Sequence, residues 1–89
     1  MATMFVRHTV KDFQAWKKVY DGFGPTQKAF GVVAEAVYQA DGKPNDITVT
    51  HDFANIAAAR KFADSDELHQ AMGSAGVVGA PTIWFTTKA

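Results

Sequence analysis

Hydrophobic and polar residues alternate along the stretch 46–53, Asp-Ile-Thr-Val-Thr-His-Asp-Phe. Its odd-numbered positions are apolar except for His51, and its even-numbered positions carry threonine and aspartate. Because successive side chains of a strand point to opposite faces, this pattern predicts a half-buried β-strand. The stretch 4–10 alternates in the same way, with His8 among its apolar residues, and predicts a second strand of the same kind.

These two strands belong to a repeated unit, because His51 lies 43 positions after His8 and the residues around them align without a gap. The strand is followed in one copy by Asp12 and in the other by Asn55, both good N-cap residues. Apolar residues at helical spacing and a pair of basic residues come next in both copies. The chain is therefore interpreted as two copies of a strand followed by a helix.

The remaining elements complete the predicted order β-α-β-β-α-β. An aromatic stripe predicts a helix from residue 13, with a break at 22–25 and a short helical piece to residue 30. A strand is expected at 32–39 and a turn at 40–45, which would make a hairpin with the strand at 46–53. Ser65 is a further cap, glycines at 73–79 predict an exit loop, and 82–87 predicts the last strand.

This order predicts a ferredoxin-like α+β fold with the helices on one face of a four-stranded antiparallel sheet, the first and third strands in the middle. The 89 residues are expected to form a single domain, 1–89. Nine basic residues balance nine acidic ones without forming a stripe, so nucleic-acid and membrane partners are not expected. There is no cysteine, and no apolar run is long enough for a spanning helix, so a cytoplasmic location is the default.

Both duplicated histidines share a face with the more apolar half of their strand. The helices must cover that face, so His8 and His51 are expected in the space beneath them. The register of the two strands is open at this stage: the histidines are either directly opposite or separated by up to roughly 13 Å. The other face mixes Phe5 and Arg7 with threonines and Asp52, and we expect a second copy of the chain to cover it.

The chain resembles the dimeric α+β barrel superfamily, in particular its antibiotic-biosynthesis-monooxygenase-like group, over essentially its whole length. The resemblance rests on 50–53 (Thr-His-Asp-Phe), 55–62 (Asn-Ile-Ala-Ala-Ala-Arg-Lys-Phe), 65–72 (Ser-Asp-Glu-Leu-His-Gln-Ala-Met) and Gly-Ala-Pro at 79–81. Family members often end the third strand with Glu-Trp, where this chain has Asp52 and Phe53. The resemblance implies a homodimer packed sheet to sheet, with a pocket between the sheet and helices of each subunit.

The resemblance favours an enzyme similar to cofactor-independent monooxygenases or polyketide cyclases, acting on a small apolar or aromatic ligand. Imidazoles with pKa values near neutrality suit proton abstraction from a phenol or carbon acid, and a tyrosine hydroxyl suits a developing oxyanion. The candidate catalytic residues are His8, His51, His69 and Tyr20. The candidate substrate-binding residues are Trp16, Phe23, Phe53, Phe62 and Met72.

Two alternatives remain open. One is a dimer that binds a small ligand without catalysis, in which the aromatic stripe is simply core and the histidines are satisfied by neighbouring groups. The other is a metal or haem site, because His69 lies where haem-degrading relatives carry an axial ligand. Those relatives also carry an asparagine on the first strand, where this chain has Arg7 and His8, and the histidine spacings match no local metal motif. We therefore predict no cofactor and no metal.

Overall fold

The computed structural model describes residues 1–89 and contains four strands and four helices. The fold follows the predicted order, with each predicted helical region divided into two consecutive helices. The elements are β1 (Ala2–Val10), α1 (Phe13–Gly22), α2 (Gly24–Ala29), β2 (Val32–Ala40), β3 (Lys43–Phe53), α3 (Ile56–Ala63), α4 (Asp66–Ser74) and β4 (Val77–Thr87).

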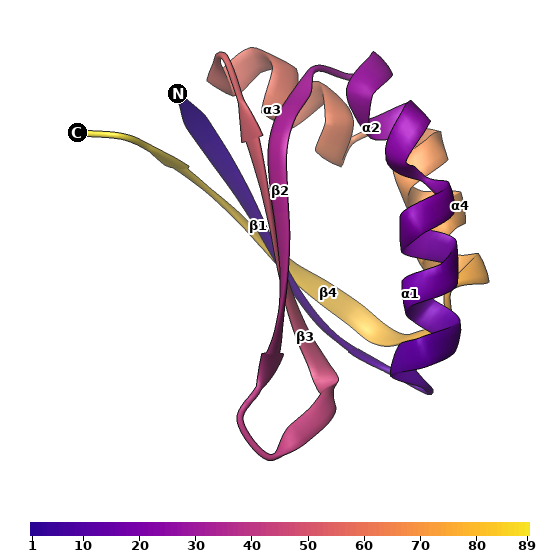
Figure 1. Ribbon diagram of the computed structural model, residues 1–89. Helices are drawn as coiled ribbons and strands as arrows, with labels where there is room; N and C mark the ends of the chain where they lie inside the picture. The colour runs from indigo at the N-terminus through magenta and orange to yellow at the C-terminus, as the bar shows by residue number, and fades with distance from the viewer.

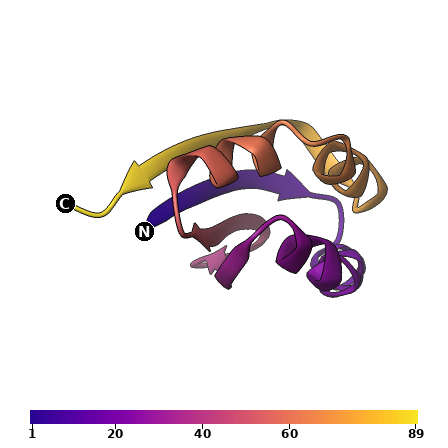
Figure 2. The ribbon, with the colours of Figure 1, turned by 90° about the horizontal axis from the view of Figure 1, so that it is seen from above.

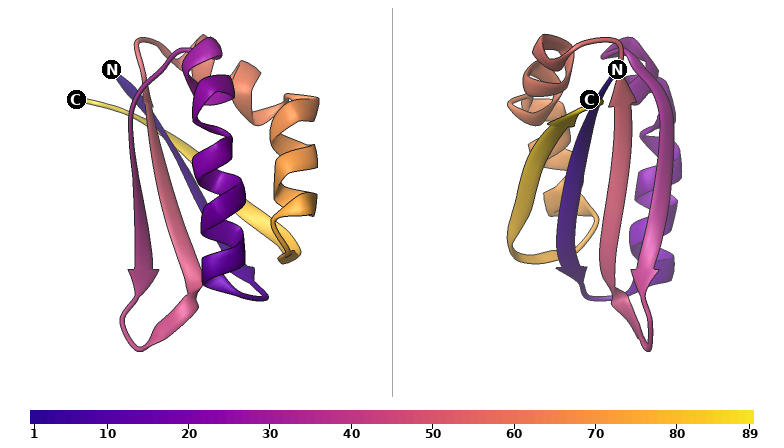
Figure 3. Two further views of the ribbon diagram at one scale, coloured as in Figure 1. Left: turned by 45° about the vertical axis from the view of Figure 1, so that its right-hand side comes forward. Right: turned by 90° about the vertical axis from the view of Figure 1, so that its left-hand side faces the viewer.

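The four strands form one antiparallel sheet in the order β2-β3-β1-β4, so the first and third strands are central, as predicted. All four helices lie on the same side of this sheet, which leaves the other face open (Figure 1). Figure 3 shows the open face with the four strands side by side and the helices behind them. Viewed from above, α1 and α2 lie over the β2–β3 side and α3 and α4 over the β1–β4 side (Figure 2). The ferredoxin-like α+β prediction is confirmed.

The repeated unit predicted from the sequence is present in the backbone. The Asp12 carboxylate accepts a hydrogen bond of 2.9 Å from the backbone N–H of Ala15, and α1 begins one residue after it. The Asn55 side chain accepts one of 2.9 Å from the backbone N–H of Ala58, and α3 begins in the same way. Each bond satisfies one of the free amides of a helix start, so both copies start their helices by the same chemistry.

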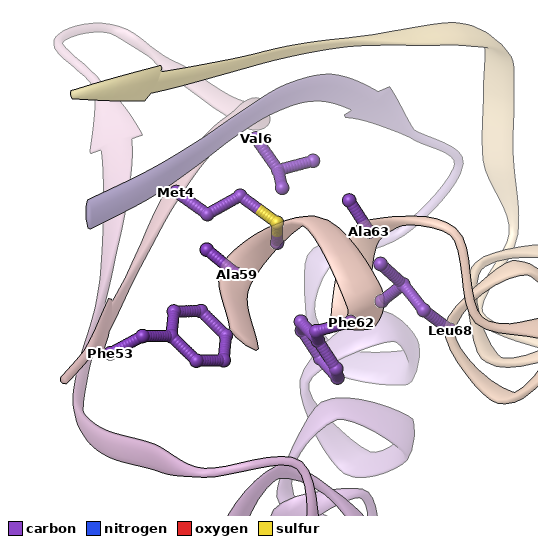
Figure 4. Close-up of a cluster of buried hydrophobic side chains, with 7 residues drawn as sticks. All are labelled: Met4, Val6, Phe53, Ala59, Phe62, Ala63 and Leu68. Atoms are coloured by element: carbon purple, nitrogen blue, oxygen red, sulfur yellow. The ribbon is translucent and has the colours of Figure 1, made fainter. Parts of the chain in front are cut away.

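The interior between sheet and helices is divided between two clusters of buried side chains. The larger cluster brings β1, β3, α3 and α4 together, with Phe53 and Phe62 fully buried and their ring centroids 5.7 Å apart. Figure 4 shows these rings beside Met4 and Ala59. The smaller cluster lies at the other end of the central strands and includes Trp16 of α1. The cavity described below lies between these two clusters.

Several element boundaries differ from the prediction. β3 begins at Lys43 rather than at 46, because only Asp41 and Gly42 are needed for the hairpin turn; Gly42 has the positive φ of 74° that such turns favour. β1 begins at Ala2 rather than at 4, because Ala2 and Thr3 pair with the end of β3. β4 begins at Val77 rather than at 82. Its pairing with β1 shifts register between Arg7 and Thr9, near Gly79, whose φ is 72°. The strand continues past this register shift and through Pro81. β4 is an edge strand, and edge strands tolerate both an irregular pairing and a proline.

The break between α1 and α2 falls at Phe23, as the glycine and proline spacing predicts. The short helix α2 contains Pro25 in its first turn, a position where the missing N–H costs nothing. No side chain caps the start of α2, in contrast to α1, α3 and α4. None of the helices is long and apolar enough to cross a membrane.

Candidate functional site

A small cavity lies between the central strands and the helices α1, α2 and α4. Its volume is about 40 Å³, and 10 of the 13 residues that line it are hydrophobic. The polar lining residues are His8 from β1, Gln27 from α2 and His51 from β3. The helix-covered apolar face of β1 and β3 forms one side of the cavity, and the aromatic face of α1 forms another.

His8 is buried, with 7% of its surface exposed, and neither ring nitrogen has a hydrogen-bond partner within the chain. Its ring makes an edge contact with the indole of Trp16, with centroids 5.7 Å apart. Burial lowers the pKa of His8, because desolvation disfavours the charged imidazolium. At neutral pH this side chain is therefore a neutral imidazole on the cavity wall.

His51 is still more deeply buried, with 3% exposed, and has different surroundings. Its Nε2 lies 3.4 Å from the amide nitrogen of Gln27, its Nδ1 has no partner, and its ring contacts Phe62 at a centroid distance of 5.2 Å. Burial lowers the pKa of His51 to about 4, although the nearby carboxylates of Glu35 and Asp52 act in the opposite direction. His51 is therefore neutral at pH 7 and has one free ring nitrogen.

The strand register places the two histidines apart. His8 pairs with Ile47, and His51 pairs with Met4, so four residues of strand separate the two histidine positions. At about 3.3 Å per residue this corresponds to roughly 13 Å, the upper end of the predicted range. Two stacked rings of α1 span the interval: Trp16 and Tyr20 have centroids 5.0 Å apart, and Tyr20 lies 6.4 Å from His51.

Tyr20 is held at the cavity edge by a hydrogen bond, because its hydroxyl donates to the Glu35 carboxylate on β2. Glu35 is the residue directly opposite His51 in the β2–β3 pairing. The pKa of Tyr20 is raised first by burial and then by this hydrogen bond to a carboxylate. The phenol therefore stays protonated, and its hydroxyl already has Glu35 as an acceptor.

The cavity brings together part of the residue set predicted from the sequence. His8, His51, Tyr20, Trp16, Phe23 and Met72 all line it. Phe53 and Phe62 do not line the cavity. They lie in the larger core cluster, where the ring of Phe62 makes an edge contact with the ring of His51. His69 lies outside the cavity. It is exposed on α4 and its Nε2 is 3.0 Å from the carbonyl oxygen of Ala63, because its position on α4 differs by one residue from that of the inward-facing Leu68.

Two polar residues of the site, Gln27 and Glu35, were not among the predicted site residues. Gln27 is 4% exposed and is the one buried polar residue of the short helix α2. An amide does not titrate and a six-residue helix has little periodicity, so the sequence offered almost no signal for it. Glu35 offered more: it is the only charged residue in the strand Val32–Ala40, in phase with Val37 on the helix-facing side.

No three side chains among the histidines, aspartates and glutamates converge closely enough to hold a metal ion. The cavity and its edge offer neutral imidazoles, an amide, a phenol and a nearby carboxylate. This set is suited to moving a proton in a dry environment and to hydrogen bonding a ligand oxygen.

No protein-family model matches this sequence, and no curated protein matches it. Solved structures do. A candidate antibiotic biosynthesis monooxygenase from Bordetella bronchiseptica has a TM-score of 0.84 at 12% identity, covering 99% of this chain and 96% of that one. SnoaB from Streptomyces nogalater, a cofactor-independent oxygenase, has a TM-score of 0.78 at 14% identity, with coverage of 98% and 91%. The chain therefore shares its fold with solved structures described as antibiotic biosynthesis monooxygenases.

Proposed function

We propose that this protein is a small-molecule enzyme that oxidises an aromatic substrate with molecular oxygen and without a cofactor. The observation that carries the proposal is His51: a neutral, buried imidazole with an unpartnered Nδ1 on the wall of a largely apolar cavity. The likeness in fold to SnoaB, a cofactor-independent oxygenase, supports it.

The proposed reaction starts with proton transfer from an activated carbon acid, such as the methylene group of an anthrone, to Nδ1 of His51. The resulting carbanion is delocalised over the ring system and transfers electrons to O₂, forming a carbon–oxygen bond and then a hydroperoxide. Loss of water from the hydroperoxide leaves a carbonyl group. One O₂ is consumed, one of its oxygen atoms enters the product and the other leaves as water. The substrate supplies all the electrons.

Gln27 is the residue that orients His51 in this scheme. The Gln27 amide nitrogen lies 3.4 Å from Nε2, so the scheme requires this amide to flip and present its oxygen instead. Nε2 then carries the ring proton, and Nδ1 keeps its lone pair for the substrate. After proton transfer both ring nitrogens carry protons, and the same amide oxygen stabilises the imidazolium. The lowered pKa of His51 does not oppose this step, because the transfer also leaves a substrate anion beside the imidazolium. The attraction between the two charges offsets the desolvation cost that lowers the pKa.

The size of the cavity sets a condition on this function. A ligand pocket for a drug-sized molecule occupies about 300–1,000 Å³, whereas this cavity measures about 40 Å³, enough for only a few water molecules. The helices must therefore move away from the sheet when an aromatic substrate binds. The apolar walls favour this, because substrate burial recovers about 25 cal/mol for each Å² of apolar surface removed from water.

The test is oxygen uptake by the purified protein with a panel of anthrones and polycyclic phenols. We expect substrate-dependent consumption of one O₂ per product, and at least a hundredfold loss of turnover in His51→Ala, the usual contribution of a general base. His69→Ala is the matched control, because it removes an imidazole outside the cavity.

The same base would also serve an aldol-type ring closure of a polyketide, a reaction that consumes no oxygen. Product formation without oxygen uptake would therefore support a cyclase instead. Saturable binding of these ligands with neither turnover nor oxygen uptake would contradict both enzymes and leave a ligand-binding dimer.

We further propose that the open face of the sheet pairs with a second copy of the chain. Phe5 and Trp84 stack there with ring centroids 5.1 Å apart, and Trp84 and Tyr38 remain 39% and 57% exposed. The charged groups of this face are already satisfied within it: Arg7 pairs with Asp46, and Asp52 accepts a hydrogen bond from Thr3. A face that is aromatic and whose charged groups already have partners suits a self-complementary interface. Native mass spectrometry should give twice the chain mass, and Trp84→Glu should shift the protein to monomer.

A further inference from the structure

We propose that the ligand site extends beyond the inner cavity into a second compartment, the outer groove, and that Tyr20 and Gln27 form the partition between the two. The outer groove lies between the helices α1 and α2 and the strand β2, with a volume of about 330 Å³. This inference rests on the proposed function, which places the reacting ring in the inner cavity. The ligand it implies is a planar aromatic ring system with an uncharged polar tail rich in hydroxyl or carbonyl groups.

The partition follows from the residues that the two spaces share. Tyr20 and Gln27 line both the inner cavity and the outer groove. The hydroxyl of Tyr20 donates to Glu35, which lines the groove, and the Gln27 amide contacts His51, which lines the cavity. Displacing Tyr20 joins the compartments while Gln27 keeps its contact with His51, and the combined volume reaches the usual range for a small-molecule site.

The buried ring nitrogens also indicate a ligand. Nδ1 of His51 and both nitrogens of His8 are buried without a partner inside the chain. A buried polar atom without a hydrogen bond costs roughly 1–3 kcal/mol, so such atoms at a cavity wall are expected to be satisfied by a bound molecule or by water. His51 lies at the Gln27 side of the cavity, next to the partition.

The charged residues of the outer groove indicate what kind of polar tail the ligand carries. Lys17 and Lys28 line it together with Asp21 and Glu35, so its formal charge is zero. Lys17 is already paired with Asp21 at 2.6 Å, and Glu35 already accepts from Tyr20. Such a lining offers two ammonium groups as donors and two carboxylates as acceptors, and it has no net charge. It therefore favours hydroxyl and carbonyl groups over a carboxylate or an ammonium group.

A rival opening exists on the other side of the cavity, where a groove of about 270 Å³ between α4 and β4 shares Met72 with it. The two helices differ in how firmly they are held. The start of α4 is capped by Ser65, and its Leu68 is buried in the larger core cluster. The six-residue helix α2 has no side-chain cap and follows a break in the chain. The shorter, uncapped helix opens at lower cost, which favours the outer groove.

Three glycines provide a matched test. Gly24 lines the outer groove, Gly73 lines the rival groove, and Gly22 lines neither. None of the three has a positive φ, and a Cβ atom at each would meet nothing within 4 Å. Gly24→Trp therefore fills the outer groove, Gly73→Trp fills the rival groove, and Gly22→Trp adds the same side chain as a control. Circular dichroism and thermal melting check that each variant folds.

The probes are 2-naphthol, a ring without a tail, and its hydroxyethyl ether, which adds an uncharged polar tail. Binding is measured by fluorescence titration and stopped-flow mixing. We expect Gly24→Trp to weaken the ether by roughly tenfold, the loss of one to two hydrogen bonds, and to leave the affinity for 2-naphthol within twofold of the wild type. We also expect it to slow the association of both probes, whereas Gly22→Trp and Gly73→Trp behave as wild type.

The outcomes separate the groove from the inner cavity. If wild type binds 2-naphthol but Gly24→Trp binds the ether normally and at the normal rate, the outer groove is not a subsite. If Gly73→Trp produces the loss instead, the opening lies at Met72, and the inference is overturned. If neither probe binds to the wild type, the apolar cavity itself fails as a ligand site, and the proposed function fails with it.

Discussion

The two copies of the strand–helix unit have the same backbone arrangement, but their side chains fill the space between helix and sheet differently. Both place a histidine on the covered face of a central strand, and both cap the following helix by a side chain at the same offset. The helix residues then diverge. Trp16 of α1 lines the cavity, and its equivalent in α3 is Ala59, which is fully buried in the core. Phe62 of α3 is fully buried, and its equivalent in α1 is Val19, a half-buried residue of the cavity wall.

The comparison shows how a duplicated scaffold acquires one site rather than two. A large ring on α3 fills the space between helix and sheet, whereas on α1 the rings stack along the helix and leave a gap beneath it. The two histidines differ accordingly: His51 has an amide neighbour and the packed ring of Phe62, and His8 has only Trp16. Side-chain size at equivalent helix positions, not a change of backbone, separates the core half from the cavity half.

The largest effect is expected from Phe62→Ala. Phe62 contacts the rings of Phe23, Phe30, Phe53 and His51, so its removal leaves a large void in a dense cluster. We expect a loss of about 3–5 kcal/mol in the free energy of unfolding, the usual cost of truncating a buried phenylalanine. The equivalent change in the other copy, Val19→Ala, should cost only about 1 kcal/mol, because its side chain is half-buried beside an existing cavity.

Urea denaturation of both variants measures the difference directly. Equal losses would mean that α1 is packed against the sheet as tightly as α3, and the contrast between the two halves would be wrong. Phe62→Leu is the conservative control: it should recover part of the loss, because it refills part of the void.

The second test uses acid. The pKa of His51 is lowered to about 4 by burial, whereas an unfolded histidine titrates near 6.5. Between these two values the unfolded chain binds a proton that the folded chain does not, so stability falls as the pH falls. The expected slope is about 1.4 kcal/mol per pH unit for each such histidine. His8 contributes in the same direction, because burial lowers its pKa too.

His51→Leu removes one titrating group while keeping an apolar side chain of similar size. Urea denaturation at pH 7, 6 and 5 should give a shallower fall in stability for this variant than for wild type. His69→Leu is the control, because it replaces an exposed imidazole outside the cavity by the same side chain. A wild-type stability that is flat from pH 7 to 5 would show that His51 titrates in the folded protein as it does in the unfolded chain, and that burial does not lower its pKa.

The sequence predicted the scaffold well, because its signals are local. Alternation, caps at Asp12, Asn55 and Ser65, and the glycine–proline break each depend on a few neighbouring residues. The site was predicted in part. The aromatic stripe of α1 and the two duplicated histidines follow from periodicity, and they line the cavity.

What the sequence could not supply depends on contacts between distant elements. The four-residue stagger of the histidines requires the strand register, and the contact of Gln27 with His51 requires the angle at which α2 meets the sheet. His69 shows the same limit: one position along α4 separates a core leucine from an exposed imidazole, and helical periodicity alone does not resolve a shift of one residue. The extension of β4 back to Val77 depends on an irregular pairing that only the partner strand reveals.

The smallest effect is expected at the two helix caps, where the copies are most alike. Asp12→Ala and Asn55→Ala each remove one side-chain acceptor from a helix start, and each should cost about 1 kcal/mol of unfolding free energy. The exchanges Asp12→Asn and Asn55→Asp keep an acceptor in place and should be nearly neutral. If the alanine variants differ by more than the scatter of the urea fits while both exchanges stay neutral, the two starts are not equivalent. The asymmetry between the copies would then begin at the backbone of the helix start, before the first ring of α1.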